Sequence, residues 1–149
     1  MRYAEFDFRL TGPGWCEARL QIDEQWVALS ASYLGDALGE LVRATLAIVT
    51  HENGEEGVSV HWEEEPGEYR WTLRPIGEDL DVQVLWFDDH DDESPQEKLR
   101  GTCSRSVFCA AIAKGARAAL ARYGFDGYKS NWHAHDFPLE TLEQLEALT

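Results

Sequence analysis

Residues Val58 to Asp88 read VSVHWEEEPGEYRWTLRPIGEDLDVQVLWFD, and this stretch decides the fold. Apolar and polar residues alternate along it in three runs, a period typical of strands with one buried face. Pro66-Gly67 and Gly77-Glu78 separate the runs and supply turns. The sequence therefore predicts three consecutive antiparallel strands, whose buried faces carry Val58, Val60 and Trp62, then Tyr69, Trp71 and Leu73, then Leu80, Val82, Val84 and Trp86.

Loops of even length keep apolar residues opposite apolar residues in both hairpins. A Pro66-Gly67 loop predicts that Trp62 lies opposite Trp71, and a four-residue loop from Glu65 to Glu68 has the same parity. A Gly77-Glu78 loop predicts that Trp71 lies opposite Val84. Further pairs expected from these registers are Val60 with Leu73, Leu73 with Val82, Glu63 with Arg70, His61 with Thr72, and Arg74 with Asp81.

The flanking segments predict a second strand meander and helices. Alternating runs at 3–10, 15–23 and 25–31 predict three more strands, and 99–103 predicts a short extra one. Helical spacing predicts one helix from Gly35-Asp36 to about Thr50, with Leu34 in its buried stripe, and a second from Ser104 or Ser106 to about Tyr123, stopped by Gly124. Pro138 suits the first turn of a terminal helix.

The expected architecture is a single domain over residues 1–149 of the α+β class. We expect one antiparallel sheet of about six strands, made of two three-strand meanders. Two main helices are expected to pack on one face of this sheet, followed by a helical C-terminal tail. The buried odd-numbered aromatics of the central stretch are thus expected to lie beneath helices.

The chain is strongly acidic, with 28 Asp and Glu against 13 Lys and Arg, and a formal net charge of −15. Such a charge repels phosphate backbones and attracts basic surfaces, so we expect a basic protein partner and no direct nucleic-acid binding. Acidity that serves solubility alone is the competing interpretation. No apolar run is long enough for a transmembrane helix, and the N-terminus has no signal-peptide pattern, which predicts no membrane contact and a cytoplasmic protein.

One loop concentrates acidic residues around His90. The partner-binding residues predicted from the sequence are this loop and two carboxylates expected on the outer face of the central strands, namely Asp88, Asp89, Asp91, Asp92, Glu93, Glu63 and Asp81. A merely solvated loop and a cation site are the alternatives. The pattern of a calcium-binding EF-hand loop is absent, so no metal is predicted.

Other candidates for chemistry do not form a catalytic constellation in the sequence. His133, His135 and Asp136 lie close together, but the spacing of a zinc-protease helix is absent. Cys16, Cys103 and Cys109 fit no zinc spacing and are expected to be reduced and buried. No phosphate-binding or dinucleotide fingerprint is present, so the sequence predicts no catalytic residue, no cofactor and no enzymatic activity.

Three short stretches bear on family. They are EEPGEYRW at 64–71, WFDD at 86–89, and Gly127-Tyr128 continuing through Trp132 to HDFP at 135–138. In these the chain resembles small acidic bacterial proteins without an assigned role. In size and charge it is also similar to immunity proteins of polymorphic and contact-dependent toxin systems. That resemblance implies a protein that neutralises a basic toxin such as a nuclease.

The sequence thus predicts a non-enzymatic acidic protein-binding module, in its most specific form an immunity protein or inhibitor. The first alternative is a bacterial structural or regulatory protein. The second is a small metal-dependent hydrolase that uses His133, His135 and the acidic loop.

Overall fold

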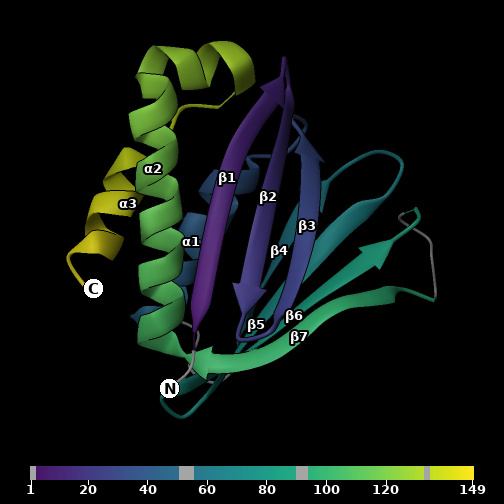
Figure 1. The fold of residues 1–149 in the computed structure, drawn as a ribbon, viewed down its shortest axis with the longest axis vertical. Helices are drawn as coiled ribbons and strands as arrows, with labels where there is room; N and C mark the ends of the chain where they lie inside the picture. Colours follow the sequence, from purple (N-terminus) through teal and green to yellow (C-terminus); the bar gives the residue numbers. More distant parts are fainter. Residues whose placement is uncertain (1–2, 51–55, 90–93, 133–134) are drawn as a thin grey trace.

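The chain forms two antiparallel sheets and three helices, seen in a computed structural model that describes residues 3–50, 56–89, 94–132 and 135–149 (Figure 1). The first sheet has the strand order β1-β2-β3 and the second the order β4-β5-β6-β7. The strands are β1 (Ala4–Gly12), β2 (Trp15–Ile22), β3 (Gln25–Ser32), β4 (Val58–Glu63), β5 (Glu68–Ile76), β6 (Asp79–Phe87) and β7 (Gln96–Ser104), and the helices are α1 (Ala37–Val49), α2 (Arg105–Trp132) and α3 (Leu139–Glu146).

The α+β class with antiparallel sheets is confirmed, but the expected single sheet of six strands is wrong. The two meanders remain separate sheets, and the segment expected as a short strand at 99–103 is the longer strand β7, paired with β6. Each sheet has one apolar face, and these two faces pack against each other. Phe6 meets Trp71 and Phe8 meets Trp62 in edge-to-face ring contacts, with centroids 6.2 and 6.3 Å apart.

The sequence predicted that helices would cover the buried tryptophans, and this prediction is wrong. Trp62, Trp71 and Val84 do share one buried face, as predicted, but the three-stranded sheet lies over that face. Instead, α1 packs beside β4, α2 runs along β1, and α3 packs against both helices (Figure 1). The helices therefore lie at the sides of the two packed sheets.

The β5–β6 register is confirmed, whereas the predicted β4–β5 register is wrong by two residues. Trp71 lies opposite Val84 and Arg74 opposite Asp81, as expected. In the first hairpin, however, Glu63 lies opposite Glu68, so Glu64 to Gly67 form the loop. The expected pairs are replaced by Val60 with Trp71, Trp62 with Tyr69, and His61 with Arg70. A shift of two residues keeps the same side chains buried, so the apolar pattern alone does not exclude it.

Helix α2 shields the free edge of β1. The Tyr123 hydroxyl accepts a hydrogen bond from Leu10 N (2.8 Å), and Arg122 Nη1 donates to Phe8 O (3.3 Å). Gly115 lets the helix backbone approach the Phe6 carbonyl closely. The unpaired backbone groups of an edge strand can pair with another chain and cause aggregation. The side chains of α2 bind some of these groups on β1.

The helix ends follow the sequence in part. Asp36 caps α1 by accepting from Gly39 N (3.3 Å), while Leu34 lies before the helix and is exposed instead of buried. The Ser104 hydroxyl accepts from Val107 N (3.1 Å) at the start of α2. Gly124, expected to stop α2, makes a kink with φ 68° and ψ 175°, after which helix continues. That extension buries Tyr128 and Trp132 against Phe8, which explains why the helix resumes.

Replacing Gly115 with Ala is expected to lower the free energy of unfolding by about 1–3 kcal/mol, because a Cβ there collides with the Phe6 carbonyl and pushes α2 away from β1. Urea unfolding followed by circular dichroism measures this change. Gly127→Ala is the matched control, since its Cβ would lie 3.6 Å from Tyr123 Cβ, an ordinary contact. A Gly115→Ala variant as stable as the control would contradict the close packing described for α2.

Candidate partner-binding surface

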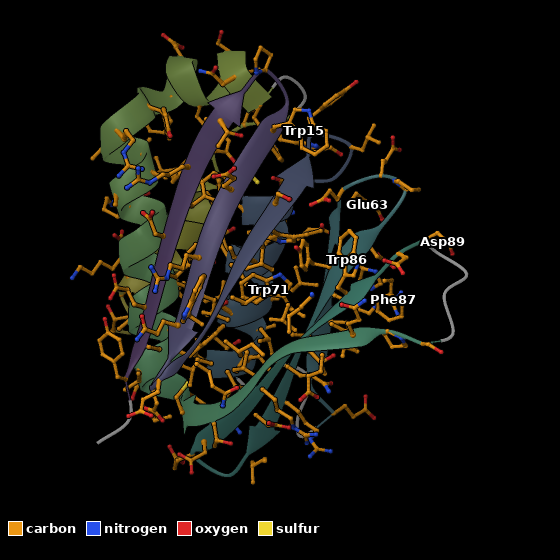
Figure 2. All side chains as sticks on the ribbon, turned by 45° about the vertical axis from the view of Figure 1, so that its right-hand side comes forward. Trp15, Glu63, Trp71, Trp86, Phe87 and Asp89 are labelled. Carbon is orange, nitrogen blue, oxygen red and sulfur yellow. The ribbon has the colours of Figure 1, made fainter. Side chains whose placement is uncertain are left out.

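Three of the predicted acidic residues lie at one end of the four-stranded sheet. Glu63 is the last residue of β4, and Asp88 and Asp89 follow the last residue of β6. Because β4 and β6 are each antiparallel to β5, they run in the same direction, and their last residues lie at the same end of the sheet (Figure 2). The other three predicted loop residues, Asp91, Asp92 and Glu93, lie outside the described residues.

Asp81 is not part of this group. It lies near the start of β6, six residues along the strand from Phe87 and so about 20 Å from the acidic end. Its carboxylate is held by Arg100 Nη2 at 3.2 Å and by Arg74 Nη2 at 3.8 Å, and its side chain is only 13% exposed. These ion pairs give Asp81 a role in joining β5, β6 and β7.

Sequence reasoning missed two carboxylates at the acidic end. Glu64 and Glu65 form the first half of the β4–β5 loop, where both backbone amides donate to Gly67 O, at 2.9 and 3.0 Å. Glu65 is exposed, and the Glu64 carboxylate accepts a hydrogen bond from the Ser30 hydroxyl on β3. The signal that would have found them is the run of three glutamates at 63–65, of which only Glu63 was predicted to contact a partner.

Large apolar side chains are exposed where the three-stranded sheet ends. Trp15 begins β2 opposite Ser32, and Tyr33 N donates to Gly14 O (2.9 Å), which holds the residues after β3 beside the β1–β2 turn. Trp15, Tyr33 and Leu34 are 42, 43 and 52% exposed. A group of large exposed apolar side chains is a common feature of interaction sites.

The acidic end and the exposed apolar residues are neighbours. A Cβ on Gly35 would lie 4.0 Å from Glu63 Cγ, and Glu64 is hydrogen-bonded to Ser30, four residues before Leu34. In Figure 2, Trp15 lies near the top of the molecule, Glu63 below it and to the right, and Asp89 farther to the right. We call this region the acidic–aromatic surface and define it by Trp15, Tyr33, Leu34, Glu63, Glu64, Glu65, Asp88 and Asp89.

Glu40 shows how closely the negative charges lie at the edge of this surface. It stands in the first turn of α1, near Glu63. Burial raises the pKa of Glu40, and the carboxylates of Asp36 and Glu63 raise it further, against opposing effects of Arg43 and His61. The ionised carboxylate is therefore less favoured in the folded protein than in water, and a cationic group brought to this place would stabilise it.

Glu68 is a buried carboxylate on the outer face of the four-stranded sheet. One oxygen lies 2.6 Å from Arg70 Nη2 and the other 3.1 Å from His61 Nδ1, and the side chain is 2% exposed. Burial alone would raise the pKa of Glu68, but the hydrogen bonds and charges of Arg70 and His61 outweigh it, and the pKa is lowered. The arrangement locks β4 to β5 and stabilises the strand pair that ends at Glu63.

The histidine and cysteine candidates have structural partners. His135 Nε2 lies 3.1 Å from Tyr33 O, and Asp136 pairs with Lys129 at 3.0 Å, while His133 is outside the described residues. The three cysteines are free and buried, and burial raises the pKa of Cys16 to about 12 and that of Cys109 to about 11. Among the described residues, no group of three or more His, Cys, Asp or Glu is placed to hold a metal ion.

Comparison with protein-family models, curated proteins and solved structures finds no match to this chain. Within the described ranges, no helix combines the length and apolarity needed to cross a membrane.

Replacing Glu68 with Gln is expected to lower the free energy of unfolding at pH 7 by about 1–3 kcal/mol, because Arg70 and His61 lose a charged, buried acceptor. The pKa of Glu68 is lowered in the folded state, so its contribution is present above the unfolded pKa of about 4.3 and disappears as the pH falls through the folded pKa. Unfolding curves between pH 3 and pH 8 are therefore expected to converge at the acid end.

Glu40→Gln is the control with the opposite sign. The pKa of Glu40 is raised in the folded state, so its ionisation costs stability at neutral pH, and the neutral amide removes that cost. Stability at pH 7 is expected to increase, with no difference well below pH 4, where the Glu40 carboxyl group is protonated in both the folded and the unfolded state. The same direction of change in both variants would contradict the opposite environments of the two carboxylates.

Proposed function

We propose that this chain is a protein-binding module, without catalytic activity of its own, that captures a basic protein partner through the acidic–aromatic surface. The observation that carries the proposal is the placement of exposed Trp15, Tyr33 and Leu34 next to a group of carboxylates at the end of the four-stranded sheet. Either feature alone is common on protein surfaces. Together they match the two components of a specific interface.

The two components act at different stages of binding. The net charge of −15, to which Glu63, Glu64, Glu65, Asp88 and Asp89 contribute at this end, accelerates the encounter with a positively charged surface. Aromatic side chains that become buried on contact then supply most of the affinity, because a few anchors dominate interface energetics. Glu40, partly buried beside Asp36 and Glu63, adds a further carboxylate with which basic groups of the partner can pair.

The more specific form of the proposal is an immunity protein or inhibitor that neutralises a basic toxin such as a nuclease. Nucleases hold the phosphate backbone with Lys and Arg side chains, and the acidic–aromatic surface presents carboxylates to the same kind of group. A protein bound there would compete with nucleic acid for the basic face. The size and charge of the chain, similar to those of immunity proteins, support this form.

The double charge reversal Glu65→Lys with Asp89→Lys is expected to weaken the partner complex by about 10-fold to 100-fold at 50 mM salt and by less at 500 mM salt. Tagged wild-type protein captures the partner from a lysate of the organism that encodes the chain. The purified partner is then titrated by calorimetry, and its inhibition is measured on labelled RNA and DNA.

Glu140→Lys with Glu143→Lys is the matched control, because both residues are exposed on α3, on the other side of the molecule, and the net charge changes equally (Figure 1). The control complex is expected to retain nearly all of its affinity. The proposal fails if the captured partner is acidic, or if both double variants weaken binding alike. Partner capture without nuclease inhibition would exclude only the more specific form.

Trp15→Ala is expected to weaken the same complex by about 30-fold, a loss typical of a buried aromatic anchor. Trp26→Ala is its control, since Trp26 is 55% exposed but lies near the start of β3, with Arg19 over its ring at 4.4 Å. Calorimetric titration with the purified partner compares the two variants. Equal losses, or none for Trp15, would remove Trp15 from the interface.

A further inference from the structure

An aromatic row crosses the four-stranded sheet at its acidic end. Trp62, Tyr69 and Trp86 lie opposite one another on β4, β5 and β6. Trp62 is fully buried against Phe8, whereas Tyr69 and Trp86 are half-buried. The strands of this sheet extend past β3 at this end, so the cover provided by the three-stranded sheet decreases along the row (Figure 1).

The two half-buried rings are held in fixed positions. Their centroids lie 4.7 Å apart with an interplanar angle of 52°. Gly67 lies directly against the six-membered ring of Trp86, where any Cβ would overlap the indole. Trp86 Nε1 donates to Asp88 Oδ1 at 2.8 Å, which fixes the rotation of the ring. A rigid aromatic surface of this kind loses little conformational entropy when a ligand packs on it.

Carboxylates flank the pair of rings. Asp88 is bonded to the indole of Trp86, and the Glu64 carboxylate is close enough to Tyr69 to raise the pKa of its hydroxyl, in addition to the larger effect of burial. On the neighbouring strand, Gln96 lies opposite Trp86 and accepts a hydrogen bond from Lys98 (3.1 Å). Because Glu64 follows Glu63 and Asp88 precedes Asp89 in the chain, the carboxylates beside the rings belong to the same acidic end.

We propose that Tyr69, Trp86, Glu64 and Asp88 form a subsite for one arginine side chain of the partner. This inference rests on the proposed function and names the chemical group of the partner that the surface binds. A guanidinium group is planar, weakly hydrated and able to stack on an aromatic face while its edge donates to carboxylates. A lysine ammonium group lacks the planar face and loses more hydration, so the subsite favours arginine.

The chain itself uses this contact on other faces. The Arg19 guanidinium lies over the Trp26 ring at 4.4 Å, and that of Arg70 lies over the Phe87 ring at 4.1 Å. In the second case Arg70 also donates to the Glu68 carboxylate, so stacking and charge pairing occur together. The proposed subsite offers the same combination, with the cation supplied by the partner.

The test uses three capped hexapeptides, of arginine, of lysine and of citrulline, the last being the neutral isostere of arginine. Protein labelled with 5-fluorotryptophan is titrated by ¹⁹F NMR, with the Trp86 resonance assigned through Trp86→Phe. The arginine peptide is expected to shift this resonance and to bind about threefold to tenfold more tightly than the lysine peptide. The citrulline peptide is expected not to bind.

Variants separate the subsite from the surface. Trp86→Leu is expected to abolish the preference for arginine over lysine while the lysine peptide still binds, since no charge changes. Tyr69→Phe and Trp26→Leu are expected to keep the preference, because the first retains its ring and the second lies elsewhere. The ¹⁹F titration of the wild-type protein keeps the inference testable even where Trp86→Leu reduces folding.

The possible failures are distinguishable. Equal binding of the arginine and lysine peptides, or an unmoved Trp86 resonance, would overturn the subsite. In that case, if the wild-type protein bound both charged peptides and the Glu65→Lys, Asp89→Lys double variant bound neither, the proposed function would stand without the subsite. If instead neither charged peptide bound the wild-type protein, or the charge-reversed variant bound them equally well, the subsite and the acidic surface on which it rests would both fail.

Discussion

The structure depends on the packing of two apolar sheet faces against each other. Phe6 and Phe8 of β1 meet Trp71 and Trp62 of the second sheet edge to face, at 6.2 and 6.3 Å between ring centroids. Aromatic rings contribute more buried area than any aliphatic side chain and favour this geometry. Because each sheet covers the other, the helices are not needed as a roof. They close the sides instead, α2 at the edge of β1 and α1 beside β4.

That arrangement leaves one end of the four-stranded sheet incompletely covered. The aromatic row of Trp62, Tyr69 and Trp86 passes there from the core to the surface, and the β4–β5 loop adds carboxylates beside it. The residues after β3 bring Tyr33 and Leu34 to the same region. A surface with both charge and large apolar groups thus follows from where the covering sheet ends.

The carboxylates of this chain fall into two kinds. Glu68 and Asp81 are held by arginines and stabilise the sheet, as the lowered pKa of Glu68 shows. Glu40 is partly buried and lies near Asp36 and Glu63; burial first and these carboxylates next raise its pKa, so its ionisation opposes folding. Natural sequences depart from local stability rules mainly where function requires it. The unfavourable charge beside exposed aromatic side chains therefore supports partner binding at the acidic–aromatic surface.

The sequence by itself determined which face of each strand is buried, because a period of two assigns every side chain to one face or the other. It also determined the β5–β6 register, since Gly77-Glu78 closes a two-residue turn between Ile76 and Asp79. It did not determine the β4–β5 register, because loops of two and four residues bury the same side chains. For the candidate surface, the acidic residues were visible as runs of charge, but Asp81 could not be separated from Glu63 without knowing that Arg100 lies beside it.

Only the tertiary structure decided that the two meanders form separate sheets that cover each other, since alternation shows that a face is apolar but not what packs on it. It alone decided how deeply the aromatic residues on the apolar faces are buried. Trp62 and Trp86 are both expected on the apolar face of the central strands, yet Trp62 is fully buried and Trp86 is only half-buried. The difference arises from where the opposite sheet ends, which is a property of contacts between residues far apart in the chain.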